Sequence, residues 1–228
     1  MTEWGCSMGS YKISKNNSVL IIIGTLIISL LINVYSSVMN SRYKLLIGKE
    51  TYNSAREIKT RNESVLSLLD QCIKAKSVTN EEMLVLYKNY TVISDEYNNL
   101  WSKYKDYGKE EIISFNKKSK TLDYSTEMPN QVYSRIETLL FEYLSLEMKN
   151  HNEKIILEGS VLEDFVAMNN MSQSLNDFYT DFNNTDIKDV DEEKKESIYI
   201  KNEYWVDILN GINSVVEPYL NHDYTLKQ

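Results

Sequence analysis

The chain's only two histidines, His151 and His222, are the first residues to consider for catalysis or metal binding. Neither belongs to an H-E-x-x-H zinc motif. The Glu-x-x-His spacing of di-iron bundle proteins also fails, because Asn150 stands three residues after Glu147. His151 lies among charged residues, including Glu153, so we interpret it as part of a solvated helix face, and we expect His222 to be exposed to solvent. The histidines therefore predict no metal site.

The two cysteines offer neither a disulfide nor a clear nucleophile. Cys6 precedes a long apolar segment and Cys72 follows it, so we expect them on opposite sides of a membrane. Cys72 occupies an apolar heptad position, which favours a buried and inert thiol. The chain also lacks the G-x-x-x-x-G-K-[ST], G-x-G-x-x-G and G-x-S-x-G motifs. We therefore expect no enzyme, no cofactor, and no catalytic, cofactor-binding or metal-ligating residue.

Tyrosine is the most unusual feature of the composition, with 17 residues, several of them at heptad positions. A buried tyrosine hydroxyl needs a hydrogen-bond partner. If the tyrosines are buried beside the polar residues that also occupy heptad positions, together they would enclose a wet or ligand-binding cavity. The interpretation that we favour instead places them at the edge of a helical bundle, with their hydroxyls in water. The tyrosines are Tyr90, Tyr97, Tyr104, Tyr107, Tyr143 and Tyr179, and the polar residues are Asn62, Asn150, Ser172 and Asn202.

A segment without charged residues, SVLIIIGTLIISLLINVYSSVM, covers residues 18–39. As a helix it would extend roughly 33 Å, slightly more than the ~30 Å hydrocarbon core of a bilayer. We predict an uncleaved transmembrane anchor, with residues 1–17 as a short N-terminal tail and residues 40–228 as a helical bundle domain. A cleavable signal peptide is the alternative, since Lys12 and Lys15 precede the segment. The apolar run is long for one, however, and no A-x-A-like site follows it.

The orientation of this anchor depends on two conflicting observations. More basic residues follow the segment than precede it, which favours a cytoplasmic C-terminal domain. Long domains, however, cross membranes largely regardless of charge, and a short tail usually stays inside. We therefore predict a single-pass cell-membrane protein with a cytoplasmic tail and an extracytoplasmic domain. The basic residues after the segment include Arg42, Lys44 and Lys49, against Lys12 and Lys15 before it.

Apolar residues recur in alternating steps of three and four after the anchor, which is the spacing of heptads. The clearest stretch begins at Met83, after a capping box formed by Thr79 and Glu82, and predicts a helix over residues 80–120. No proline separates the anchor from Lys76, so we expect the anchor helix to continue into the bundle. The heptad positions of these two stretches are Ala55, Ile58, Asn62, Val65, Leu69 and Cys72, then Met83, Leu86, Tyr90, Ile93, Tyr97, Leu100, Tyr104 and Tyr107.

Two further heptad stretches follow residue 130. The first predicts the third helix of the bundle. It contains a stutter near Gly159, so we expect this helix either to bend there or to split into two. The second follows a polar, acidic loop and predicts one helix that ends near Tyr219. The heptad positions are Val132, Ile136, Leu139, Tyr143, Leu146, Val161, Phe165, Met168, Ser172, Leu175, Tyr179 and Phe182, then Ile198, Asn202, Trp205, Leu209, Ile212, Val216 and Tyr219.

The scarcity of turn residues indicates the fold class. The chain has only two prolines and seven glycines, which favours a few long helices over a sandwich, a barrel or an α/β fold. We therefore predict an all-α protein, in which a single N-terminal transmembrane helix continues into an antiparallel four-helix, coiled-coil-like bundle. A split third helix would give the bundle five segments.

The charge balance argues against one class of partner. Lys and Arg number 25 against 33 Asp and Glu, so the net charge is −8. An acidic chain without a basic stripe lacks the electrostatic footprint of nucleic-acid binding, and we expect no nucleic-acid partner. The abundance of Ile, Lys, Asn and Tyr, whose codons are AT-rich, indicates a low-GC genome, which we expect to be bacterial.

The leading hypothesis is a membrane-anchored helical-bundle interaction or scaffolding protein without catalytic activity. Its partners would be the lipid bilayer, through residues 18–39, and a protein. Thr25 and Ser29 form a small-xxx-small pair in the anchor, which would let two anchors pack closely, so a homo-oligomer is a further alternative. The alternative is a ligand-sensing extracytoplasmic four-helix bundle that signals through a separate membrane partner. A sensor needs a concave pocket, whereas a scaffold needs an exposed apolar stripe.

Overall fold

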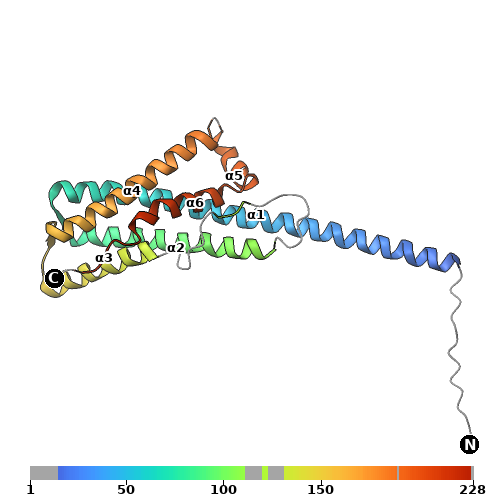
Figure 1. Ribbon diagram of the computed structural model, residues 1–228, viewed down its shortest axis with the longest axis horizontal. Coiled ribbons are helices and arrows are strands. Elements are labelled where there is room, and N and C mark those ends of the chain that lie inside the picture. Colours follow the sequence, from blue (N-terminus) through green and yellow to red (C-terminus); the bar gives the residue numbers. More distant parts are fainter. Residues whose placement is uncertain (1–14, 111–119, 123–130, 189, 227–228) are drawn as a thin grey trace, which may run out of the picture. The chain divides into compact units, whose positions relative to one another are not determined.

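The computed structural model describes residues 15–110, 120–122, 131–188 and 190–226. These residues are mostly helical, as predicted, and they divide between two compact units, Met1–Leu45 and Leu46–Gln228, called here the N-terminal and C-terminal units (Figure 1). In chain order the elements are α1 (Lys15–Ala75), β1 (Ser77–Thr79), α2 (Asn80–Glu110), α3 (Gln131–Asn150), β2 (Lys154–Ile156), α4 (Gly159–Asp186), α5 (Glu192–Lys201), α6 (Tyr204–Val216) and the 3-10 helix η2 (Glu217–Tyr219).

The part of α1 in the N-terminal unit carries the long apolar segment. Its large apolar side chains between Val19 and Met39 are exposed. The Thr25 hydroxyl donates a 2.9 Å hydrogen bond to the Ile21 carbonyl, so this polar group is satisfied within its own helix. A window of this helix has a mean hydropathy of 2.4, and in the described part of the chain α1 is the one helix long and apolar enough to cross a membrane.

The boundary between α1 and α2 follows the sequence closely. α1 is unbroken to Ala75, and Lys76 then takes a left-handed conformation with φ 54°. The Thr79 backbone N–H donates to Glu82 Oε2 at 2.8 Å, and the Glu82 N–H donates to Thr79 Oγ1 at 3.2 Å. The predicted capping box is therefore confirmed, and α2 begins at Asn80.

The C-terminal end of α2 differs from the prediction of a helix over residues 80–120. The helix ends at Glu110, residues 111–119 lie outside the described part of the chain, and Lys120 is not helical. The side chain of Tyr107, a predicted heptad position, also lies outside the described residues. Lys120 is instead ion-paired with Asp207 of α6.

The predicted third helix splits into α3 and α4, with β2 between them, so the alternative of a bend is wrong. β2 pairs antiparallel with β1, placing Val78 opposite Ile155. Gly159 begins α4 with φ +53°, a conformation that glycine adopts without strain. This strand pair was not predicted, because each strand has only three residues, too few for a pattern to be recognised.

The predicted fourth helix also breaks, which gives six α-helices in the described residues instead of four or five. Glu203 stands between α5 and α6 with φ 55°, a left-handed conformation that is rare for a residue other than glycine. The break allows two large aromatic side chains, Tyr199 before it and Trp205 after it, both to be buried. Tyr199 of α5 packs on Tyr52 of α1, with ring centroids 5.0 Å apart.

Polar contacts show that α1 runs antiparallel to two neighbours. Along α2, Arg61 pairs with Asn89, and Ser54 with Glu96. Along α4, the Asn169 amide donates to Asp70 at 3.1 Å, and the Asn62 amide donates to the Ser172 carbonyl at 2.8 Å. Both α2 and α4 therefore pack against α1 and run antiparallel to it.

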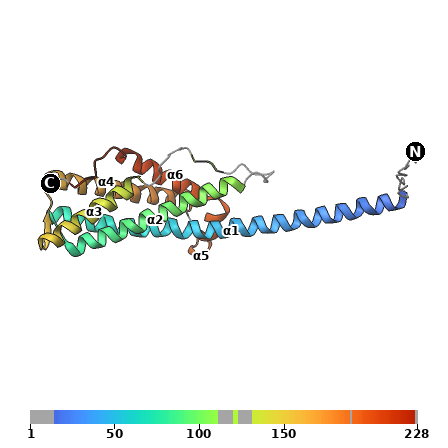
Figure 2. The same cartoon turned by 90° about the horizontal axis from the view of Figure 1, so that it is seen from below.

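Two shorter helices, α3 and α6, both pack against α2, and both run antiparallel to it (Figures 1 and 2). On α3, Tyr133 contacts Tyr97 with ring centroids 5.6 Å apart. On α6, Asn213 accepts a hydrogen bond from the same Tyr97, and Trp205 lies against Tyr104 nearer the C-terminal end of α2. The two helices therefore cover different lengths of α2, α3 toward its N-terminus and α6 toward its C-terminus.

Most of the predicted heptad positions form the core of the C-terminal unit. All those from Ala55 to Cys72 and from Met83 to Leu100 are buried. The register shifts near the end of α3, where Glu147 rather than Leu146 is buried. Gly211 allows α6 to approach α4 closely, because a Cβ there would clash with the Phe178 ring.

We predict that Ile93→Asp destabilises the protein by several kcal/mol, because Ile93 is fully buried and an aspartate there would lack a partner. The matched change Lys88→Ala, on the exposed face of α2, should cost less than about 0.5 kcal/mol. Denaturant midpoints of the full chain in mild detergent, at constant m-value, measure both. Equal, small effects would contradict the assigned heptad register.

Candidate functional site

An exposed apolar patch lies where α2 and α3 pack together. It consists of Leu84, Tyr87, Phe141 and Met148, called here the α2/α3 patch. Phe141 is 56% exposed and Met148 is 71% exposed, and both belong to the outer face of α3 because they are seven residues apart. The Tyr87 ring lies 5.9 Å from that of Phe141. Leu84 is one turn before Tyr87, so it lies toward the same end of the helix pair as Met148.

Charged residues border this patch without covering it. Lys88 on α2 and Glu142 and Lys149 on α3 are exposed. Single exposed apolar residues are ordinary, but several on one helix pair, bordered by charge, favour an interaction surface. The sequence reasoning missed this patch, because Phe141 and Met148 fall outside the heptad positions and were not considered.

Four of the six tyrosines at heptad positions are buried, so the wet-edge interpretation that we favoured from the sequence is wrong for them. Tyr104 is half-buried, and the side chain of Tyr107 lies outside the described residues. Tyr90 and Tyr97 are at most 1% exposed, and Tyr143 and Tyr179 are each 3% exposed. Tyr179 donates a 3.0 Å hydrogen bond to the Ala55 carbonyl. Burial raises the pKa of Tyr97 to about 12, and burial beside Asp164 raises that of Tyr143 to about 12.

The polar residues that share these positions divide into two pairs. Asn62 and Ser172 are buried and bonded to each other, and the Ser172 hydroxyl is 3.4 Å from the Tyr90 hydroxyl. Asn150 is exposed, and Asn202 is half-buried at the break between α5 and α6. Asn62, Ser172 and Tyr90 therefore link α1, α4 and α2 through buried hydrogen bonds, which helps to fix the register of these helices.

The sequence predicted that His222 is exposed to solvent, and this prediction is wrong. It is half-buried, and its Nε2 lies 2.7 Å from Oδ1 of Asp164, a residue of α4 with 0% exposure. His222 also lines a shallow groove of about 460 Å³, together with Val166, Pro218 and Tyr219. The two partners are 58 residues apart in the sequence, and no local pattern connects them.

Arg135 of α3 holds the segment that follows α6. Its guanidinium donates hydrogen bonds to the carbonyls of Tyr219, Leu220 and His222, at 3.3, 2.7 and 3.0 Å. The guanidinium carbon also lies 5.8 Å from the ring centroid of Tyr224, which is 3% exposed. Together with the contact between His222 and Asp164, these bonds fasten residues 219–224 to α3 and α4.

The remaining candidates from the sequence are separated in space. His151 is exposed just after α3, with φ 54°, while its neighbour Glu147 is buried, so the expected solvated face does not include Glu147. Cys72 is 1% exposed, which confirms the expected burial. Burial, with Glu82 nearby, raises the pKa of the Cys72 thiol to about 11. Among the described residues, no group of His, Cys, Asp and Glu is arranged to hold a metal ion.

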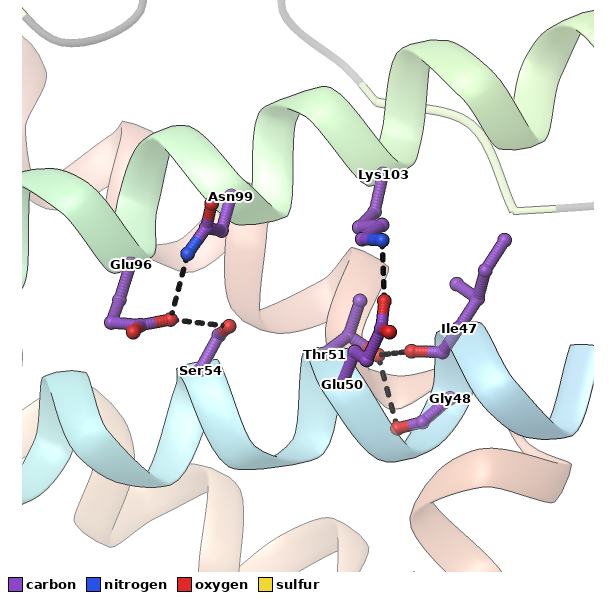
Figure 3. A network of polar contacts seen from close by, with 8 residues as sticks. All are labelled: Ile47, Gly48, Glu50, Thr51, Ser54, Glu96, Asn99 and Lys103. Carbon is purple, nitrogen blue, oxygen red and sulfur yellow. Dashed lines mark hydrogen bonds and ion pairs between the residues drawn. The ribbon is translucent and has the colours of Figure 1, made fainter.

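A second concave feature lies between α1 and α2 (Figure 3). It is an open groove of about 540 Å³, lined mostly by charged and amide side chains. Glu50 of α1 is ion-paired with Lys103 of α2 within it, and Ser54 donates to Glu96 at 2.6 Å. The groove residues fall outside the predicted heptad positions, so the heptad pattern does not single them out.

We predict that His222→Ala lowers the free energy of unfolding by about 1–3 kcal/mol, because the fully buried Asp164 carboxylate loses its contact with the imidazole. The matched control is His151→Ala, at the exposed histidine, which should change stability by less than about 0.5 kcal/mol. Denaturant midpoints of the two variants test this. Indistinguishable midpoints would contradict the assigned role of the contact with Asp164.

No protein-family model, curated protein or solved structure matches this chain. No residue role is therefore transferred from a relative. The α2/α3 patch, the fastened C-terminal segment and the groove between α1 and α2 are the features from which a function is inferred.

Proposed function

We propose that the protein is a membrane-anchored interaction module without catalytic activity, and that the α2/α3 patch binds its protein partner. The observation that carries this proposal is the exposure of Phe141 and Met148, at 56% and 71%, beside Leu84 and Tyr87. Aromatic and methionine side chains are enriched at protein interfaces, where each buries a large apolar area. The partner is either a second copy of the chain or a different protein.

The C-terminal unit that presents the patch is an antiparallel bundle with four helix positions. α1, α2 and α4 each occupy one position, and α3 and α6 share the fourth. The antiparallel contacts of α1 with α2 and α4, and of α2 with α3 and α6, support this arrangement. The buried heptad positions support coiled-coil-like packing within it.

Residues 18–39 anchor the protein in the lipid bilayer of a cell, with the C-terminal unit outside the cytoplasm. The length and hydropathy of α1 support the anchor, and its apolar side chains there are exposed. The proposed orientation follows from the short tail before the anchor and the long domain after it.

The orientation is tested with the full chain in the membrane of bacterial cells. Protease added to intact spheroplasts should digest the C-terminal unit, because an extracytoplasmic domain is accessible from outside. An epitope placed after Gln228 reports the digestion. Complete protection until the cells are lysed would show the opposite orientation.

The patch is tested by placing the photo-crosslinking residue p-benzoylphenylalanine at position 141 of the full chain in cells. We expect a discrete cross-linked species there, because Phe141 would lie in the interface. Position 180, exposed on α4, is the matched control and should give none. The mass of the species separates a second copy from a different protein. Equal cross-linking at positions 141 and 180 would contradict the assignment of the patch.

A second candidate is a ligand-sensing module that signals through a separate membrane partner. The buried tyrosine hydroxyls do not decide for or against it: three are paired within the core, whereas those of Tyr133 and Tyr143 have no hydrogen bond among the described residues. The groove between α1 and α2 does favour it, since its volume of about 540 Å³ falls within the ~300–1,000 Å³ of small-molecule sites.

A further inference from the structure

The groove between α1 and α2 contains three carboxylates, and two of them are neutralised by cations. Glu50 is ion-paired with Lys103 (Figure 3). Glu57 accepts a 2.7 Å hydrogen bond from Nε of Arg61, one turn further along α1, and its Oε1 is also 2.7 Å from a second guanidinium nitrogen. These pairs leave Glu96 as the one carboxylate in the groove without a cationic partner among the described residues.

Glu96 is held in a fixed orientation by two neutral donors. The Ser54 hydroxyl and the Asn99 amide both donate to its Oε2, at 2.6 and 3.2 Å (Figure 3). Ser54 is only 7% exposed, so packing fixes the position of its hydroxyl. Oε1 of Glu96 has no hydrogen bond within the described residues and remains available as an acceptor.

A cation of the same groove is also without a partner. Arg56 lines the groove and is exposed, and in the described part of the chain its guanidinium makes no hydrogen bond or ion pair. A guanidinium binds a carboxylate or phosphate through two parallel hydrogen bonds. Once the paired charges are set aside, the groove offers one negative and one positive group.

We propose that this groove binds a small zwitterion, with its ammonium group at Oε1 of Glu96 and its anionic group at Arg56. The amide of Asn53 and the apolar side chain of Val92 complete the lining. A free amino acid and the phosphoethanolamine headgroup of a lipid share this chemistry. The groove lies on a different helix pair from the α2/α3 patch, so this site is independent of the proposed protein interface.

Binding is measured by calorimetry on the full chain in mild detergent, with each standard L-amino acid and with O-phosphoethanolamine as separate probes. At least one zwitterion should bind saturably, with one site per chain. The best amino acid is then compared with its N-acetyl and methyl-ester forms, each of which removes one charge. Both forms should bind at least about 10-fold more weakly, because each loses one charge-assisted contact. Binding of O-phosphoethanolamine alone would assign the site to a lipid headgroup.

Two pairs of variants locate the site. Arg56→Gln and Glu96→Gln should each weaken binding at least about 10-fold, and Arg56→Gln should leave the thermal midpoint of the free protein unchanged. Lys74→Gln on α1 and Asp95→Asn on α2 remove exposed charges outside the groove and should bind like the unaltered protein. The proposal is overturned if no probe binds, if the capped forms bind equally well, or if Arg56→Gln binds normally.

Discussion

The C-terminal unit depends on covering the apolar face of α2 from Met83 to Tyr104. At about 1.5 Å per residue, the 31 residues of α2 extend roughly 46 Å, whereas the 20 residues of α3 extend roughly 30 Å and the 13 of α6 roughly 20 Å. Neither shorter helix covers α2 alone, but the two together match its length. Tyr97 marks the junction, since it contacts Tyr133 of α3 and Asn213 of α6.

This requirement explains why the chain turns where it does. α6 must return to α2 after α4 has passed along α1, and the break at Glu203 allows α5 to stay against α1 while α6 crosses to α2 and α4. The contact between His222 and Asp164 and the bonds from Arg135 then hold the chain beyond α6. The proposed interaction surfaces lie on faces of the helices where no packing requirement determines the residue.

The helical class, the long N-terminal helix, the capping box at Thr79 and most of the core were predictable because they depend on local spacing. A heptad repeat reports which face of a helix is buried, but not which helix covers it. The break at Glu203 was not predictable, since no glycine or proline marks it and tertiary packing stabilises the left-handed residue. Asp164 was missed because its partner is 58 residues away, and Arg56 and Glu96 because a charge on a helix surface is ordinary by itself.

The sharing of one helix position by α3 and α6 has a consequence for biosynthesis. Among the described residues, α6 covers part of the C-terminal half of α2, and the bond between Tyr97 and Asn213 spans 116 residues of sequence. A ribosome adding about 5–20 residues per second needs roughly 6–23 s to make that stretch. In the later part of this interval α1, α2 and α3 are already synthesised, while the surface of α2 that α6 covers is still exposed. We expect this apolar surface to favour aggregation of the nascent chain until α6 docks.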